Sequence, residues 1–175
     1  MKRIFGLTIA IVGVILFFTS CENDEIILPE SEFFVAFDYK NADKVIVDTS
    51  SRFQQSVEVL KIPVFVAGKK TSAITVDFET AATDLNGVFT INPELNQSLA
   101  VEDVDFEILN SSKQLNFPDG VGYDTIYVRA INSGFTGHKF VFLNLTGNSA
   151  GYNIGYQSGV NGDSIVRASH RIRFY

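Results

Sequence analysis

Three short apolar runs between residues 113 and 146 place the strongest constraint on how this chain can fold. The runs are Leu115–Phe117, Ile126–Ile131 and Phe140–Leu145, and turn-forming residues such as Pro118-Asp119-Gly120 separate them. Each run is too short for a helix and rich in aromatic and β-branched residues, which is typical of strands. Three antiparallel strands with one apolar face do not fold alone in water. The runs therefore predict a second sheet that packs against them.

The rest of the chain supplies further strands. Residues 74–80 alternate apolar and polar side chains, which predicts a strand with one buried face. The same alternation in residues 164–175 predicts an inner face made of Val166, Ala168, His170, Ile172 and Phe174. Residues 33–39, 45–47 and 56–67 also have strand character.

Two irregular features modify the strand at residues 56–67. Its apolar phase changes at Leu60-Lys61, which predicts a β-bulge or a crossing between sheets. Pro63 has no N–H group, so we expect this strand to lie at a sheet edge there.

Two long connections interrupt the strands. Residues 81–99 are polar, and Asn92-Pro93-Glu94 within them predicts one or two helical turns. Residues 147–163 are rich in glycine and predict a flexible loop. With about seven to nine strands, short turns and no amphipathic helix, the pattern predicts an all-β sandwich.

Composition limits the functions open to the chain. A net charge of −6 argues against nucleic-acid binding, which needs a basic surface to neutralise phosphates. A single cysteine rules out an intrachain disulfide and a cysteine-based zinc site. The length of 175 residues suits one domain with a substantial core.

The N-terminal sequence predicts that the protein is exported and attached to a membrane. Lys2 and Arg3 precede an apolar run of signal-peptide length, and small residues then lead to Cys21. The segment Phe18-Thr19-Ser20-Cys21 resembles a bacterial lipobox, although Leu usually stands where Phe18 does. The acidic residues after Cys21 resemble the export signals of surface lipoproteins of the Bacteroidota type. The alternative is an ordinary cleaved signal.

This reading divides the chain into a lipoprotein signal peptide at 1–20, an acidic tether at 21–32 and a β-sandwich domain at 33–175. It implies a membrane partner reached through acylated Cys21 and a place on the surface of the cell outer membrane.

Five segments in order resemble the Calx-beta fold family: VEVLKIPVFVAG, ITVDFET, VEDVDFEI, KQLNFPDGVGYDTIYVRAIN and FVFLNLTG. The resemblance covers about residues 56–175 and implies an immunoglobulin-like Greek-key β-sandwich. Calcium-binding members carry acidic residues in the loop that corresponds to residues 132–138, and this chain has no carboxylate there. Glu102, Asp103 and Asp105 are the remaining candidates for calcium, which takes six to eight oxygen ligands. We expect no cofactor and treat the three as acidic residues at a corner.

No catalytic constellation is visible, so we expect no enzyme activity. His138 and His170 are isolated histidines, and the carboxylates of Asp77 and Glu79 share the solvated face of one strand. A small hydrolase is the least supported reading.

Aromatic residues are the better candidates for ligand binding, because exposed Tyr and Phe suit sugar faces and protein partners. The candidates are Tyr123, Tyr127, Phe140, Phe142, Tyr152 and Tyr156. The alternative for Phe140 and Phe142 is a cover made by the N-terminal region or the connection at 81–99. Short Asp-Ser/Thr-aliphatic patterns also make Thr125 and Ser164 candidate O-glycosylation sites.

The sequence thus predicts a non-catalytic, lipid-anchored β-sandwich of the cell envelope that binds or adheres to a glycan or protein. The alternative is a structural accessory subunit of an outer-membrane surface assembly, for example one that takes up glycans.

Overall fold

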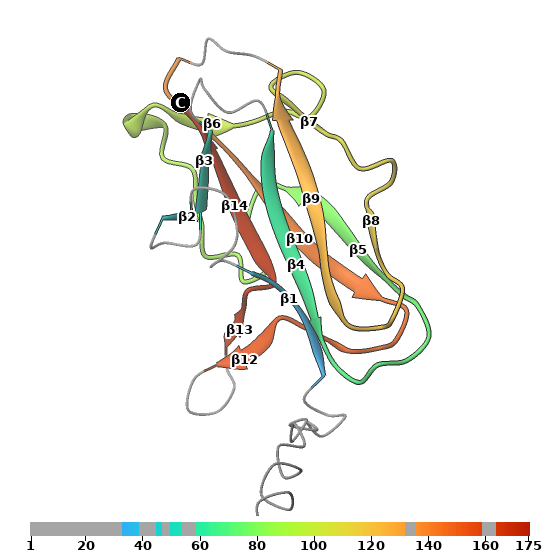
Figure 1. Ribbon diagram of the computed structural model, residues 1–175. Helices are drawn as coiled ribbons and strands as arrows, with labels where there is room; N and C mark the ends of the chain where they lie inside the picture. Colours follow the sequence, from blue (N-terminus) through green and yellow to red (C-terminus); the bar gives the residue numbers. More distant parts are fainter. Residues whose placement is uncertain (1–32, 39–44, 47–49, 54–58, 132–135, 159–163) are drawn as a thin grey trace, which may run out of the picture.

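A computed structural model describes residues 33–38, 45–46, 50–53, 59–131, 136–158 and 164–175. Within these residues the regular structure is almost all strand, and two main sheets pack face to face as a sandwich (Figure 1). The long strands are those that the sequence predicts, and short strands of two to four residues bring the described total to fourteen. No helix among the described residues is long and apolar enough to cross a membrane.

Sheet A contains five strands, and the two at its centre are long. Strands β4 (Leu60–Ala67) and β9 (Gly122–Ala130) pair antiparallel at its centre. Strand β7 (Phe106–Ile108) flanks β9. On the other side, β1 (Phe34–Phe37) pairs with β4, and β11 (Asn153–Ile154) runs parallel to β1.

Sheet B is built around β10 (His138–Asn148), which pairs with β14 (Ser169–Phe174) on one side and β5 (Ile74–Ala81) on the other. The outer strands are β8 (Gln114–Phe117), β3 (Ser50–Phe53) and β2 (Val45–Ile46). Strand β6 (Gln97–Leu99) runs parallel to the start of β10. Strands β12 (Tyr156–Ser158) and β13 (Ser164–Val166) form a separate pair.

The core lies between the two sheets, where alternate side chains of each strand meet. The predicted inner faces of β5 and β14 are confirmed for the described side chains, since Ile74, Val76, Phe78, Ala168, His170, Ile172 and Phe174 are all buried. The burial of β4 follows the same period of two, with Leu60, Ile62, Val64 and Val66 directed inward.

The three apolar runs that predict neighbouring strands belong to different sheets. Strands β8 and β10 lie in sheet B on either side of β5, whereas β9 lies in sheet A. The chain changes sheet between β8 and β9. There the carboxylate of Asp124 on β9 accepts the backbone N–H of Asn116 on β8 at 2.8 Å. This bond satisfies an N–H of β8 that the ladder with β5 does not use.

Of the two alternatives for the phase change near Leu60, the β-bulge is not seen in the described strand, because the pairing of β4 with β9 runs without a shift from Leu60 to Val66. The chain does change sheets before β4, since β3 lies in sheet B and β4 in sheet A, and residues 54–58 of this crossing lie outside the described residues. The predicted edge position of Pro63 is wrong. The strand is interior, between β1 and β9. Pro63 is tolerated because it stands opposite the end of β1, where its carbonyl accepts the N–H of Asp38 at 2.9 Å.

Strand β10 is buried on both faces. Val141, Leu143 and Leu145 point into the core, while Phe140 and Phe142 point outward and are only 4% exposed. Phe89, from the connection between β5 and β6, covers both rings with centroid distances of 5.2 and 5.0 Å. The alternative in which the connection at 81–99 covers these residues is therefore confirmed. The expectation that Phe140 and Phe142 are exposed for ligand binding is wrong.

The two long connections contain more order than the sequence predicts. The expected helical turn is a 3-10 helix, η2 (Pro93–Leu95), and the side chain of Asn92 caps it by accepting the N–H of Glu94. The glycine-rich segment forms β11 and β12 instead of a loop over its described part. The side chain of Asn148 holds its start by accepting the N–H groups of Ala150 and Tyr152.

We predict that Leu143→Ala lowers the free energy of unfolding by about 2–5 kcal/mol, because Leu143 is fully buried between the sheets. Val88→Ala should change it by less than about 0.5 kcal/mol, because Val88 is 77% exposed. Urea denaturation of both variants measures this. Equal small effects would show that the inward phase of β10 is misassigned.

The second stability prediction concerns His170, which is fully buried beside Phe37 at a ring-centroid distance of 5.5 Å. Burial lowers the pKa of His170 from 6.5 to about 3, since desolvation disfavours the charged imidazolium. The unfolded chain takes up this proton near pH 6.5, and the folded chain does not. Below pH 6.5 the free energy of unfolding therefore falls by up to about 1.4 kcal/mol per pH unit, and above it this group has no effect.

A His170→Leu variant isolates this effect from the titration of the carboxylates. Its stability relative to the native chain should rise as the pH falls from 7 to 4, in urea titrations at each pH. Parallel pH profiles for the two proteins would contradict the assignment.

Candidate functional site

The outer face of sheet A carries a row of aromatic side chains from three strands. Phe34 of β1 packs edge-on against Phe65 of β4 at 5.6 Å, and Phe65 lies 6.0 Å from Tyr123 of β9. Tyr127 stands on the same face of β9 as Tyr123, two alternations further along. We refer to Phe34, Phe65, Tyr123 and Tyr127 as the aromatic face.

The two tyrosines are the exposed part of this face. Tyr123 is 66% exposed and Tyr127 is 39% exposed, although β9 is an interior strand. Their backbones are about 13 Å apart by strand rise. Between them lie the shorter side chains of Pro63 and Thr125, which stand opposite each other on β4 and β9. The two tyrosine rings therefore stand higher than the surface between them.

The strand that presents these rings is firmly held. Beyond the end of β7, the side-chain amide of Asn110 donates to the carbonyl of Thr125 and accepts the N–H of Tyr127, at 3.0 and 2.9 Å. These bonds extend the ladder along β9 with a side chain in place of a backbone. Glu107 and Arg129 pair across β7 and β9 just beyond. The aromatic face is therefore built on a fixed strand, which favours a preformed site.

Tyr152 lies apart from the aromatic face. Its ring packs edge-on against Phe33 at 5.3 Å and against the core. A Cβ atom at Gly68 would lie 2.9 Å from the ring, so the close approach of the chain there depends on glycine. Tyr152 is thus a packing residue. The side chain of Tyr156 lies outside the described residues.

The acidic residues of the corner before β7 have separate partners. Both oxygens of Asp105, which is 1% exposed, lie 2.7 Å from the ammonium of Lys139, and one of them also accepts the N–H of Val101. Glu102 accepts hydrogen bonds from Lys113 and Thr80, each at 2.7 Å. Asp103 is exposed in a left-handed conformation with φ of 65°.

These residues do not fit calcium. Among the described residues, no three His, Cys, Asp or Glu side chains converge on one point. Calcium needs six to eight oxygen ligands, whereas Asp105 and Glu102 already bind ammonium groups. Partial burial raises the pKa of Glu102, but the hydrogen bonds from Lys113 and Thr80 and the charge of Lys113 outweigh burial and lower this pKa below its ordinary value. The carboxylate is therefore charged and neutralised by a lysine of this chain.

The other sequence candidates are spread over the molecule. His170 belongs to the core, whereas His138 stands at the start of β10 with its ring 6.4 Å from that of Tyr175. Thr125 is half-buried in the middle of sheet A. The lipidation candidate Cys21 and the side chain of Ser164 lie outside the described residues.

Phe65 has a signal in the sequence, because it occupies the outward phase of β4 and alternation predicts that its side chain points away from the core. Its position beside Tyr123 follows only from the pairing of β4 with β9 in the fold. Phe89, Lys113 and Lys139 have no such signal, because their partners are remote in the chain.

We predict that Lys139→Ala lowers the free energy of unfolding by about 3 kcal/mol, because it leaves the buried carboxylate of Asp105 without its cation. From the sequence alone, Lys139 lies just outside an apolar run and a change there is expected to be nearly neutral. The ion pair overturns that expectation. Lys70→Ala is the matched control, since Lys70 and Asp119 form an ion pair in which both side chains are more than 60% exposed.

The control should change stability by less than about 0.5 kcal/mol. Urea denaturation near pH 7 compares the two variants. If both lysines prove equally dispensable, the Asp105–Lys139 pair has no special role in the fold.

Comparison with known proteins identifies the architecture. No family model matches the sequence. No curated protein matches it in sequence. Among solved structures, the chain is similar to the apo form of the Calx CBD1 domain, with a TM-score of 0.51 and 13% identity over 81% of this chain and 95% of that one. It is also similar to CBD12 from CALX1.2, with a TM-score of 0.52 and 14% identity over 81% of this chain and 43% of that one. The fold is a Calx-beta-like β-sandwich, as the sequence motifs predict.

Proposed function

We propose that this chain is a non-catalytic binding module of the cell envelope, anchored by lipid at Cys21, whose aromatic face takes a glycan. The observation that carries the proposal is the exposure of Tyr123 and Tyr127 on a fixed interior strand of sheet A. The outer face of an antiparallel sheet is usually polar, so exposed rings there mark an interaction site.

The chemistry of the face favours a carbohydrate ligand. A tyrosine offers an apolar ring and one hydroxyl, which matches a sugar ring with one apolar face and hydroxyls at its rim. Because the side chains of Pro63 and Thr125 are shorter than the two rings, an extended ligand has room to lie between Tyr123 and Tyr127. A protein ligand is the alternative outcome of the test below.

The proposed anchor is compatible with the direction of the chain. Phe33 begins the described domain at the lower end of the sandwich, where β1 starts (Figure 1). Residues 21–32, when fully extended, reach about 40 Å at roughly 3.3–3.6 Å per residue. Acylation at Cys21 would therefore hold the lower end near a membrane and leave the upper end directed away from it.

The first test is ligand binding by the aromatic face. We predict that the full chain in detergent binds members of a glycan array, and that Tyr123→Ala and Tyr127→Ala each weaken binding at least about tenfold. Truncating a ring at the centre of an interface commonly costs more than about 1.4 kcal/mol. Tyr175→Ala is the control, because Tyr175 is 42% exposed but does not belong to the aromatic face.

Thermal denaturation should show that all three variants remain folded. A chain that binds no glycan, or a Tyr175 variant that loses binding as much as the others, would refute the glycan proposal.

The second test concerns the anchor. Cys21→Ser should abolish metabolic labelling with a fatty acid, because acylation requires this thiol. Replacing Glu22, Asp24 and Glu25 with alanine should retain the label but reduce protease shaving of the protein on intact cells. Partition of the native protein into the aqueous phase of a detergent separation would refute lipid anchoring.

A second candidate function, a structural accessory subunit of a surface assembly, is favoured by one specific observation. The apolar side chains of Leu99, Val101, Val104 and Ile131 are exposed at the end of the sandwich opposite Phe33.

A further inference from the structure

The turn before β7 exposes apolar side chains at the upper end of the sandwich. Leu99, Val101, Val104 and Ile131 are 40%, 52%, 60% and 50% exposed. We refer to these four residues as the corner surface. The carbonyl of Val101 accepts the N–H groups of Val104 and Asp105 at 3.3 and 2.8 Å, and Ile131 donates its N–H to the carbonyl of Asp105. These bonds hold the backbones of Val101, Val104 and Ile131 together in a compact turn, and the pairing of β6 with β10 fixes Leu99 just before it.

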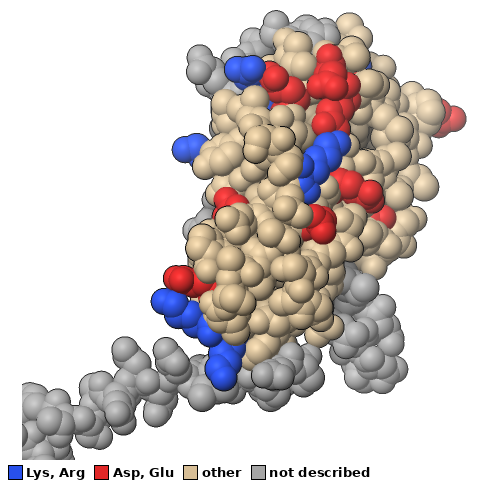
Figure 2. Space-filling view, turned by 90° about the vertical axis from the view of Figure 1, so that its right-hand side faces the viewer, with Lys and Arg blue, Asp and Glu red and all other residues tan. Residues whose placement is uncertain are grey.

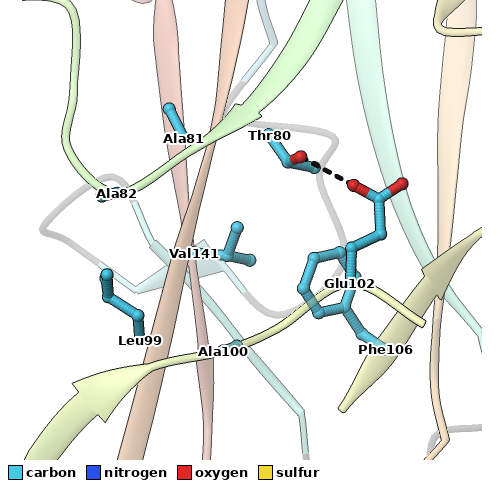
Figure 3. A pocket seen from close by; sticks show the side chains of 8 residues that line it. All are labelled: Thr80, Ala81, Ala82, Leu99, Ala100, Glu102, Phe106 and Val141. Carbon is cyan, nitrogen blue, oxygen red and sulfur yellow. Dashed lines mark hydrogen bonds between the residues drawn. The ribbon is translucent and has the colours of Figure 1, made fainter. Parts of the chain in front are cut away.

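A pocket of about 200 Å³ opens beside the corner surface (Figure 3). Its inner wall is apolar, since Phe106 and Val141 are nearly fully buried, and Ala81 and Ala100 also line it. Leu99 lines the pocket and belongs to the corner surface. The pocket can accept one apolar side chain, in the manner of an anchor residue at a protein interface.

The walls of the pocket are fixed before any partner arrives. Ala100 donates its N–H to the carbonyl of Phe140 at 2.8 Å, which ties the wall to β10. The pairing of β6 with β10 and the Asp105–Lys139 ion pair hold the two ends of the same segment. A fixed pocket loses little conformational entropy on binding.

The net charge beside the pocket is weakly negative, because Lys113 and Lys139 pair with Glu102 and Asp105, and within the described residues the exposed carboxylate of Asp103 adds one negative charge. One oxygen of Glu102 binds Lys113 and Thr80, and within the described residues its other oxygen accepts no hydrogen bond; Figure 3 shows it pointing away from Thr80. The carboxylate of Asp103 is exposed nearby. Figure 2 shows acidic side chains gathered toward the upper end of the face that it draws. A cationic group of a partner would find complementary charge here.

We infer that the corner surface and its pocket dock a segment of another protein that inserts one apolar side chain and carries a Lys or Arg beside it. A second copy of this chain is a poor occupant, because each copy carries a net charge of −6 and would bring the same acidic corner. The inference stands whether or not the aromatic face binds a glycan.

The position of the corner suits docking in an assembly. The seven residue steps of β4 between Ala67, opposite Phe34, and Leu60, opposite Val128, span about 23 Å. The corner and the start of the domain therefore lie at opposite ends of the sandwich. A partner held there would not compete with whatever holds the N-terminal segment.

The test is selection of peptides from a random displayed library on the full chain in detergent, followed by titration of the enriched sequence as a synthetic peptide. We expect an enriched apolar residue flanked by Lys or Arg. Leu99→Ser and Val101→Ser should weaken its binding at least tenfold, and Glu102→Gln should reduce the dependence of binding on salt. Val88→Ser is the matched control, because Val88 is exposed but outside the corner surface.

Three results would overturn the inference. They are the absence of an enriched basic and apolar pattern, equal binding of the peptide to the native chain and the Leu99→Ser variant, and self-association of the native chain that Leu99→Ser removes. The last result, seen in sedimentation, would make a second copy the occupant. Tyr123→Ala should leave peptide binding unchanged, so this test is independent of the glycan test.

Discussion

The burial of β10 on both faces is the constraint on which the rest of the structure depends. Its inner face meets sheet A, and its outer face presents Phe140 and Phe142, which water would otherwise surround. Phe89 covers these rings, so the chain after β5 must cross the outside of sheet B. That crossing delivers β6 to the start of β10 and brings the turn before β7 to the upper end of the sandwich. The path that covers Phe140 and Phe142 thus also places the turn before β7.

The turn before β7 contains a buried carboxylate, that of Asp105, which needs a cation as its partner. Asp105 accepts the N–H of Val101 inside the fold, and a buried carboxylate is costly unless a cation pairs with it. Lys139 supplies the cation from β10, and Lys113 does the same for Glu102. Lysine ammonium groups of the chain therefore bind Glu102 and Asp105, two of the three carboxylates that the Calx-beta resemblance marks as calcium candidates. What remains at this end is a rigid apolar corner with one open carboxylate oxygen, and the aromatic face stands on the other side of the core.

Alternation within a strand could be predicted from the sequence, because it depends on neighbouring residues. The inner faces of β5 and β14 and the outward direction of Tyr123 and Tyr127 follow from it. Alternation does not specify which strand lies next to which, so the placement of β8, β9 and β10 in two sheets could not be predicted. A cover over Phe140 and Phe142 by the connection at 81–99 could be proposed from the apolar character of both faces of this strand. The choice of Phe89 as the covering ring and the pairing of Asp105 with Lys139, 34 residues away, depend on contacts that form only in the folded chain. Accordingly, the tyrosines of the site could be predicted, whereas the partners of Phe140, Phe142 and Asp105 could not.

The most direct measurement of the central claim, that ligand binds across the outer face of sheet A, is tyrosine footprinting of the native chain. Mild iodination with and without bound glycan, read by mass spectrometry, compares the reactivity of Tyr123, Tyr127 and Tyr175, which are all exposed in the free protein. The account predicts that the ligand protects Tyr123 and Tyr127 and leaves Tyr175 reactive. Protection of Tyr175 alone, or equal reactivity of all three with ligand bound, would contradict it.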